Sequence, residues 1–147
     1  MGGWGSRQDL LISGQRAPAD SGQTTTLYAP ATQEPLAEVA VAGPSDVERA
    51  VEDAHRAFAT GPWRRLNPRE RGRLLLNLSR LIRDHAEALA RTESRNVGKP
   101  IREAREEVSL AADCFEYYAG VTTKVGGHSV PVAAPGIHLA AEAGPGG

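Results

Sequence analysis

The segment Trp63–Pro100 constrains the fold more than any other part of the chain, because it carries the signals for both ends of a helix. The run Asn67–Glu70 places asparagine at the N-cap, proline at the first helical position and glutamate three residues after the cap. The run Gly98–Pro100 supplies the glycine and proline that end helices. We therefore predict an amphipathic helix over residues 68–92, whose apolar stripe comprises Leu74, Leu75, Leu78, Leu81, Ile82 and Leu89.

Two further amphipathic helices flank this one. Ser45 is a good N-cap, Glu48 completes a capping box three residues later, and Thr60-Gly61-Pro62 ends the first helix. The third helix is predicted from Ile101 to Tyr118, and Ala119-Gly120 closes it. The predicted apolar faces are Val47, Ala50, Val51, Ala54 and Phe58 on the first helix, and Ile101, Ala104, Val108, Ala111, Phe115 and Tyr118 on the third.

Short strands precede the helices. Leu10–Ile12 is an apolar run followed by a Ser-Gly turn, Gln23–Tyr28 contains three consecutive threonines, and Leu36–Val41 is rich in small and β-branched residues. Together they predict a small antiparallel β element, which would be marginal without a helix to pack on. Residues 121–132 could supply one more strand.

The two ends of the chain carry few large apolar side chains. Residues 1–9 are predicted to be flexible. Residues 133–147 are almost entirely alanine, glycine and proline, so they cannot bury enough surface to offset the entropy lost on ordering. We expect this tail to be disordered, and we expect the ordered part to span residues 10–132.

Charge and cysteine content exclude several classes of function. The formal net charge is −1, from 17 basic and 18 acidic side chains, so no basic field favours nucleic acid or an anionic membrane. The longest aliphatic runs are three residues, far too short to span a bilayer. A single cysteine and the lack of a secretory signal fit a reducing compartment, so a cytoplasmic location is expected.

The order of local motifs resembles the amino-terminal portion of the NAD(P)-dependent aldehyde dehydrogenase family. Leu11–Gly14 resembles the family's opening strand and turn, and Glu93–Pro100 resembles its Glu-Ser/Thr-x-Asp-x-Gly-Lys-Pro signature. Phe115–Gly120 resembles the end of the family's third helix. Departures are Ser13 and Ala29 where the family has asparagine, and Asn96 where it has aspartate. The motif resemblance spans residues 10–132, and a reading-frame shift near Val132 is one explanation for its end.

The resemblance implies an α/β fold: the amino-terminal part of a cofactor-binding domain, with short antiparallel strands plus three amphipathic helices. It implies NAD(P)-dependent oxidation of an aldehyde substrate to a carboxylic acid, with a homo-oligomer or a paralogue subunit as partner. The family's catalytic and dinucleotide-binding motifs belong to later portions of a longer chain and do not occur here. We therefore predict that this chain alone is inactive and binds neither NAD nor NADP tightly. The alternative is a non-catalytic helical binding module that docks on a partner such as a full-length paralogue.

The residues themselves offer no catalytic, cofactor-binding or metal site. Cys114 is the only thiol, but its neighbours Asp113 and Glu116 are acidic and a nucleophilic thiolate is stabilised by cations, so we predict a structural, semi-buried cysteine. Lys99 lacks the glycine-rich loop of a phosphate site, and Gly126-Gly127 precedes no helix. The histidines show no metal-ligand spacing; they are His55, His85, His128 and His138.

Overall fold

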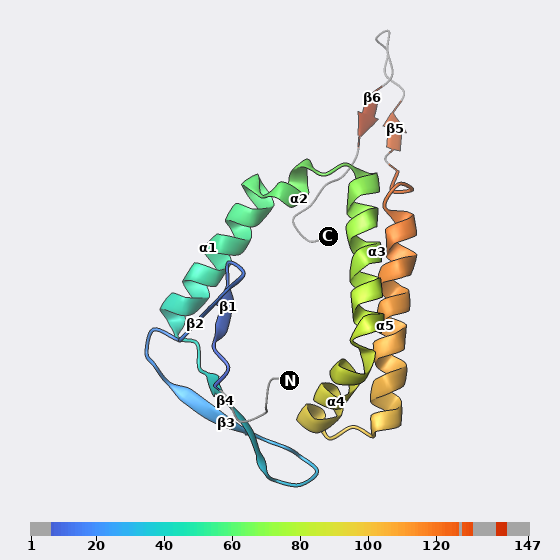
Figure 1. The fold of residues 1–147 in the computed structure, drawn as a ribbon. Coiled ribbons are helices and arrows are strands. Elements are labelled where there is room, and N and C mark those ends of the chain that lie inside the picture. Colours follow the sequence, from blue (N-terminus) through green and yellow to red (C-terminus); the bar gives the residue numbers. More distant parts are fainter. Residues whose placement is uncertain (1–6, 127, 131–137, 141–147) are drawn as a thin grey trace.

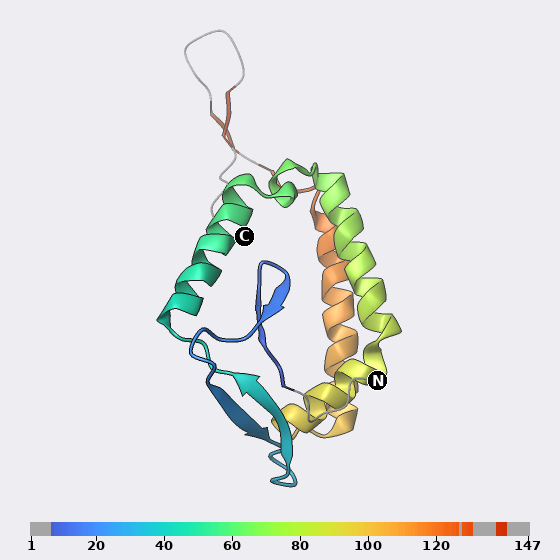
Figure 2. The ribbon, with the colours of Figure 1, turned by 60° about the vertical axis from the view of Figure 1, so that its left-hand side comes forward.

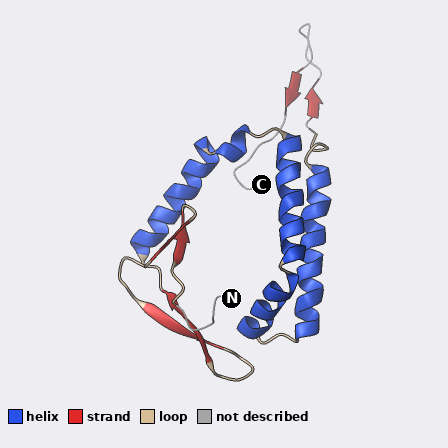
Figure 3. Ribbon diagram, viewed as in Figure 1, coloured by secondary structure: helices blue, strands red, loops and turns tan. Residues whose placement is uncertain are grey.

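The fold is an open frame with strands and one helix on one side and a helical hairpin on the other (Figure 1). It is a computed structural model that describes residues 7–126, 128–130 and 138–140. Strands lie beside and below α1, whereas α3 and α5 run side by side across the frame (Figure 3). The elements, in order, are β1 (Leu10–Ile12), β2 (Gln15–Ala17), β3 (Thr24–Tyr28), β4 (Pro35–Ala40), α1 (Pro44–Thr60), α2 (Pro62–Arg65), α3 (Pro68–Asp84), α4 (Ala86–Val97), α5 (Ile101–Val121), β5 (His128–Val130) and β6 (His138–Ala140).

The strands form separate antiparallel hairpins rather than one β element. β1 pairs with β2 around a turn in which Ser13 and Gly14 both have positive φ, and β3 pairs with β4. β2 was not predicted, because its polar sequence lacks the alternation typical of a strand. Gln8 also joins β4: its N–H donates to the Glu38 carbonyl at 2.7 Å. This residue is therefore held in place although residues 1–9 were predicted to be flexible, while residues 1–6 lie outside the described part.

The first helix begins earlier than predicted. Its N-cap is Gly43, not Ser45, and the capping carboxylate belongs to Asp46, which accepts from the Gly43 N–H at 2.9 Å. The Ser45 hydroxyl instead donates to the Asp20 carboxylate at 2.9 Å. The predicted Ser45–Glu48 capping box is therefore wrong, and the physical reason is tertiary: Asp20 takes the serine hydroxyl. The end at Thr60 is confirmed.

The predicted caps of the second helix are confirmed, but the helix is divided. The Glu70 N–H donates to Asn67 Oδ1 at 3.0 Å, and the Asn67 N–H donates to Glu70 Oε2 at 2.8 Å. At the far end Gly98 adopts the left-handed conformation with φ 76°. Between them His85, at φ −108° and ψ 14°, separates α3 from α4. The change of direction allows α4 to pack on α5, where Ala90 is fully buried.

The helical hairpin is held together by small side chains. Gly72 and Ser79 of α3 and Ala104 and Ala112 of α5 are buried, so the two helices approach closely. Leu75 and Ile82 of the predicted stripe are half-buried, whereas other members of the predicted stripes remain exposed: Val47, Val51, Phe58, Leu74, Leu78, Leu81 and Leu89. These helices therefore present a second apolar face that no described element covers.

The exposed surface is large for the size of the chain. The accessible surface of the whole chain, including the residues outside the described part, is 11312 Å², whereas a compact monomer of 15.6 kDa would expose about 7,300 Å². The difference is about 4,000 Å². Figure 2 shows the same open arrangement of the described elements from a second direction.

β5 and β6 pair as an antiparallel hairpin, with His128 opposite Ala140. β5 falls within the segment predicted to supply a strand. β6 lies in the segment 133–147 that we predicted to be disordered; its residues 138–140 are paired with β5. Residues 133–137 and 141–147 lie outside the described part. Among the described helices none has the length and apolar character needed to cross a bilayer.

Candidate functional site

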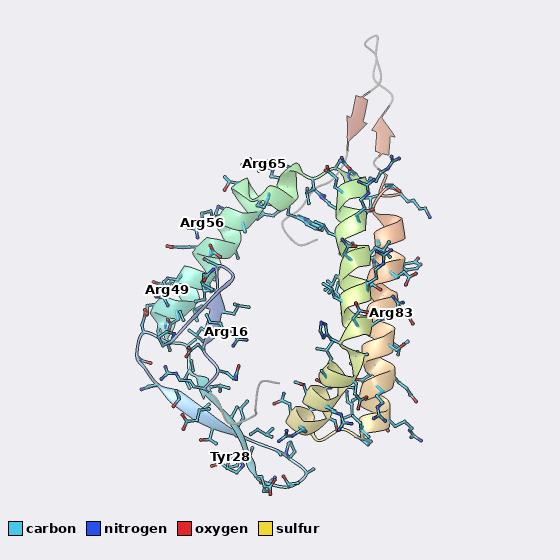
Figure 4. All side chains as sticks on the ribbon, viewed as in Figure 1. Arg16, Tyr28, Arg49, Arg56, Arg65 and Arg83 are labelled. Carbon is cyan, nitrogen blue, oxygen red and sulfur yellow. The ribbon has the colours of Figure 1, made fainter. Side chains whose placement is uncertain are left out.

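Cys114, the only candidate nucleophile, is exposed on α5, so the prediction of a semi-buried cysteine is wrong. Its neighbours Asp113 and Glu116 both pair with Arg83 of α3, at 2.7 and 2.6 Å. Figure 4 places Arg83 where α3 runs beside α5. The Asp113 and Glu116 carboxylates raise the pKa of the Arg83 guanidinium, so the polar groups around the thiol are engaged in holding two helices together.

The histidines do not gather into a site in the described part of the chain. His55 is exposed on α1 and His85 is exposed at the junction of α3 and α4. His128 and His138 lie in β5 and β6, and their side chains are outside the description. Among the described residues no group of three or more histidine, cysteine, aspartate or glutamate side chains could hold a metal ion.

Lys99 links α4 to α5. Its ammonium pairs with Glu107 and, at 3.5 Å, with Glu93, and its carbonyl accepts from the Ser94 hydroxyl at 2.7 Å. Glu107, followed by Glu93, raises the pKa of the lysine. An ammonium held by two carboxylates is poorly placed to bind a phosphate, so the geometry supports a structural role for the Gly-Lys-Pro turn.

A buried carboxylate fixes α1 to the turn before β3. Asp46 is 1% exposed and accepts from the Gly43 N–H, from the Asp20 N–H at 3.3 Å and from Arg49 at 2.5 Å. Arg49, near the start of α1 in Figure 4, also pairs with the Asp20 carboxylate at 2.8 Å. Sequence reasoning missed this cluster; the signal was an aspartate three residues after Gly43. All its groups are partnered, so the cluster is structural.

An apolar groove of about 380 Å³ lies between β1 and α1. Asp46 is its only ionisable lining residue, and that carboxylate is fully engaged as described. In two views the β1–β2 hairpin lies inside the frame bounded by α1, α2 and α3 (Figures 1 and 2). The groove is therefore suited to contact with an apolar surface and not to a catalytic reaction. We call it the β1–α1 groove; its apolar lining includes Leu10, Leu11, Ile12, Val47, Val51 and Ala54.

Comparisons with known proteins agree on one family. The sequence profile described as the aldehyde dehydrogenase family matches residues 17–147. DhaS, a candidate aldehyde dehydrogenase of Bacillus subtilis (strain 168), is 40% identical over 124 residues, which are 84% of this chain and 25% of the relative. The betaine aldehyde dehydrogenase of the same organism is 37% identical over 123 residues, 84% of this chain and 25% of the relative.

Solved structures of aldehyde dehydrogenases also resemble the chain. An NAD-dependent aldehyde dehydrogenase from Sinorhizobium meliloti superposes with a TM-score of 0.80 at 37% identity, over 86% of this chain and 25% of that chain. The NAD⁺ complex of an aldehyde dehydrogenase from Bacillus cereus gives 0.82 at 36% identity, over 89% and 27%. The chain thus spans about a quarter of the length of the relatives it matches.

Proposed function

The chain belongs to the aldehyde dehydrogenase family, and on this premise we propose that it provides the amino-terminal scaffold of an enzyme that oxidises an aldehyde to a carboxylic acid with NAD or NADP. The observation that carries the proposal is the superposition on the S. meliloti and B. cereus enzymes at more than 35% identity. The chain alone is inactive in this proposal. A cytoplasmic location, which the single cysteine favours, is part of the same proposal.

The described residues do not fit a dinucleotide, which supports a scaffold role. A pyrophosphate binds where a glycine-rich turn opens a helix and leaves backbone N–H groups free. Here Asp46 and Glu70 place their carboxylates at the first turns of α1 and α3, where they cap the backbone and repel phosphate. The thiol, the oxyanion donors and the cofactor site of the reaction are therefore assigned to residues other than these.

A chimera tests the proposal. The chain is joined to the remaining three-quarters of the B. subtilis betaine aldehyde dehydrogenase and assayed for NADH formation from betaine aldehyde, with the intact enzyme as reference. We expect the chimera to be active, the isolated chain to be inactive, and the chimera carrying Cys114→Ala to keep its activity. A soluble chimera with native-like circular dichroism but no activity would contradict the scaffold role. Turnover by the isolated chain that is lost in Cys114→Ala would contradict its inactivity.

The second candidate is a non-catalytic binding module, either self-associated or docked on a partner such as a full-length paralogue. The uncovered apolar side chains of α1 and α3 favour it. Size exclusion of the chain alone and with an intact family member separates the two candidates. A stable complex with the intact enzyme favours the module, and no complex favours the scaffold.

A further inference from the structure

Three arginines gather around one hollow between α4 and α5. The hollow has a volume of about 480 Å³, and its lining comprises Arg91, Ser94 and Arg95 of α4 and Ile101 and Arg105 of α5. Arg91 and Arg95 are one turn apart on α4, so their positive charges repel each other. Among the described residues that line the hollow none is acidic. Positive charge is therefore concentrated at this place, although the chain as a whole has a formal net charge of −1.

A carboxylate beside the hollow holds two of the arginines in position. Glu87 of α4 pairs with Nε of Arg91 at 2.7 Å, and it accepts from Nε and Nη2 of Arg105 at 2.9 and 3.0 Å. The contact with Arg105 joins the two helices, so it fixes that side chain relative to α4. Two guanidinium groups have about ten N–H donors, whereas one carboxylate has about four acceptor positions. Glu87 therefore orients the two arginines, compensates one of their two positive charges and leaves donors for a further acceptor.

We propose that this hollow binds a small multivalent oxyanion, a molecule that carries several phosphate or carboxylate groups. A planar guanidinium group forms two parallel hydrogen bonds to either group, and such charge-assisted bonds are stronger than neutral ones. Arg95, in the last turn of α4, adds its guanidinium to the same hollow. A bound anion offsets the repulsion between the like charges on α4. The site is independent of the proposed scaffold role, which requires no anion.

The size and lining of the hollow favour a small ligand over nucleic acid or the redox cofactor. A volume of about 480 Å³ lies within the range of small-molecule pockets, about 300–1,000 Å³. Nucleic acid is bound by basic side chains that follow its phosphate backbone, and the formal net charge of −1 gives no such field. The pyrophosphate of a dinucleotide binds at a glycine-rich turn that opens a helix, whereas this hollow presents guanidinium groups of side chains.

Isothermal titration calorimetry of the full 147-residue chain tests the site with inorganic phosphate, pyrophosphate and citrate as probes. The titrations are run at low ionic strength, because salt screens exposed charges, and sodium chloride of equal ionic strength is the blank. We expect one pyrophosphate or citrate to bind per chain, and to bind more tightly than inorganic phosphate, because a multivalent anion contacts more than one arginine. Arg91→Gln should weaken this binding about fivefold, since it removes a charge-assisted contact at an exposed site.

Arg102→Gln is the matched control. Arg102 is an exposed arginine of α5 that does not line the hollow, so this variant has the same change in net charge as Arg91→Gln. It should bind the probes as tightly as the unchanged chain. Circular dichroism of both variants checks that the helices are retained. The fold should tolerate Arg91→Gln, because the pair of Arg91 with Glu87 is exposed and such pairs contribute little to stability.

The three probes and two variants leave no outcome undecided. Tighter binding of pyrophosphate than of citrate would assign the hollow to phosphate-bearing molecules, and the reverse order would assign it to carboxylate-bearing ones. Equal weakening by Arg91→Gln and Arg102→Gln would show that the anions respond to net charge, and would overturn the hollow as their site. Heats no larger than those of the sodium chloride blank for all three probes would also overturn it. Neither result would affect the scaffold role, which the activity of the chimera tests separately.

Discussion

At the scale of single residues, Asp46 joins two segments that are distant in sequence. Its buried carboxylate satisfies the backbone N–H groups of Gly43 and Asp20 and pairs with Arg49. We predict that Asp46→Ala lowers the free energy of unfolding by about 2–3 kcal/mol, since it leaves these donors unpaired. Urea titration followed by circular dichroism measures this loss. Asp84→Ala, an exposed aspartate at the end of α3, is the control and should change little.

The asparagine cap of α3 gives a second prediction at this scale. Asn67 and Glu70 satisfy each other's backbone N–H groups. Asn67→Ala removes one half of this exchange and should cost about 1 kcal/mol, seen as a lower thermal midpoint. Asn77→Ala, at an exposed position in the middle of the same helix, should be neutral or slightly stabilising, because alanine is the better helix former. Equal effects of the two substitutions would contradict the role of the cap.

The two helix starts also show what sequence can and cannot decide at this scale. The Asn67 cap was predictable, because its candidate residues had no competitor nearby. Before α1, two pairs have the same spacing of three residues: Ser45 with Glu48, and Gly43 with Asp46. The choice between them depends on Asp20, which lies far away in sequence and accepts from the serine hydroxyl. Local pattern contains no information about that contact.

At the scale of elements, the packing of α3 on α5 depends on a glycine. A Cβ at Gly72 would stand 2.8 Å from the Ala119 carbonyl oxygen and 2.8 Å from the Thr122 hydroxyl, whereas a Cβ at Gly120 would meet nothing within 4 Å. Both residues are helical. We predict that Gly72→Ala destabilises the chain by about 1–3 kcal/mol through overpacking. Gly120→Ala should stabilise it by about 0.5–1 kcal/mol through helix propensity. Chemical denaturation measures the change in the free energy of unfolding for each variant. Changes of the same sign in the two variants would contradict this prediction.

The ion pair between α4 and α5 predicts a pH dependence. Glu87 accepts from Arg105 at 2.9 and 3.0 Å, and this pairing, followed by the charge of Arg91, lowers the pKa of Glu87 below its ordinary 4.5. A lowered pKa contributes stability that is fully present above the unfolded value and is lost as pH falls through the folded value. Urea midpoints at pH 6.5 and pH 3 should therefore differ less in Glu87→Gln than in the unchanged chain. Glu106→Gln, an exposed glutamate on α5, should leave the difference as it is.

Elements were predictable where one local signal dominates. The end of α4 at Gly98 follows from the left-handed conformation that glycine adopts readily. The break at His85 was not predictable, because histidine is an ordinary helix residue and the apolar stripe continues across it. Beyond the junction α4 packs on α5, and Ala90 of α4 is fully buried. Packing therefore overrides periodicity at this junction.

At the scale of the whole molecule, the absence of catalytic residues stays a prediction from sequence, and the β1–α1 groove was not predicted at all. Reactive groups can be recognised in a sequence by residue type and spacing, and no such pattern was recognised in this chain. A groove depends on where a hairpin lies against a helix. Val51 and Leu11 were each expected to be apolar surface on separate elements; that they face one hollow is visible only in three dimensions.

The surplus surface leads to the last prediction, on the cooperativity of unfolding. The unfolded chain would expose about 22,600 Å², so folding to 11312 Å² buries about three-quarters of what a compact monomer of this mass buries. Since the urea m-value is proportional to the surface exposed on unfolding, the isolated chain should show about three-quarters of the m-value of a compact domain of equal length. The apolar dye ANS should bind it as well. An m-value equal to that of a compact domain, without dye binding, would mean that the chain adopts a more compact arrangement in solution.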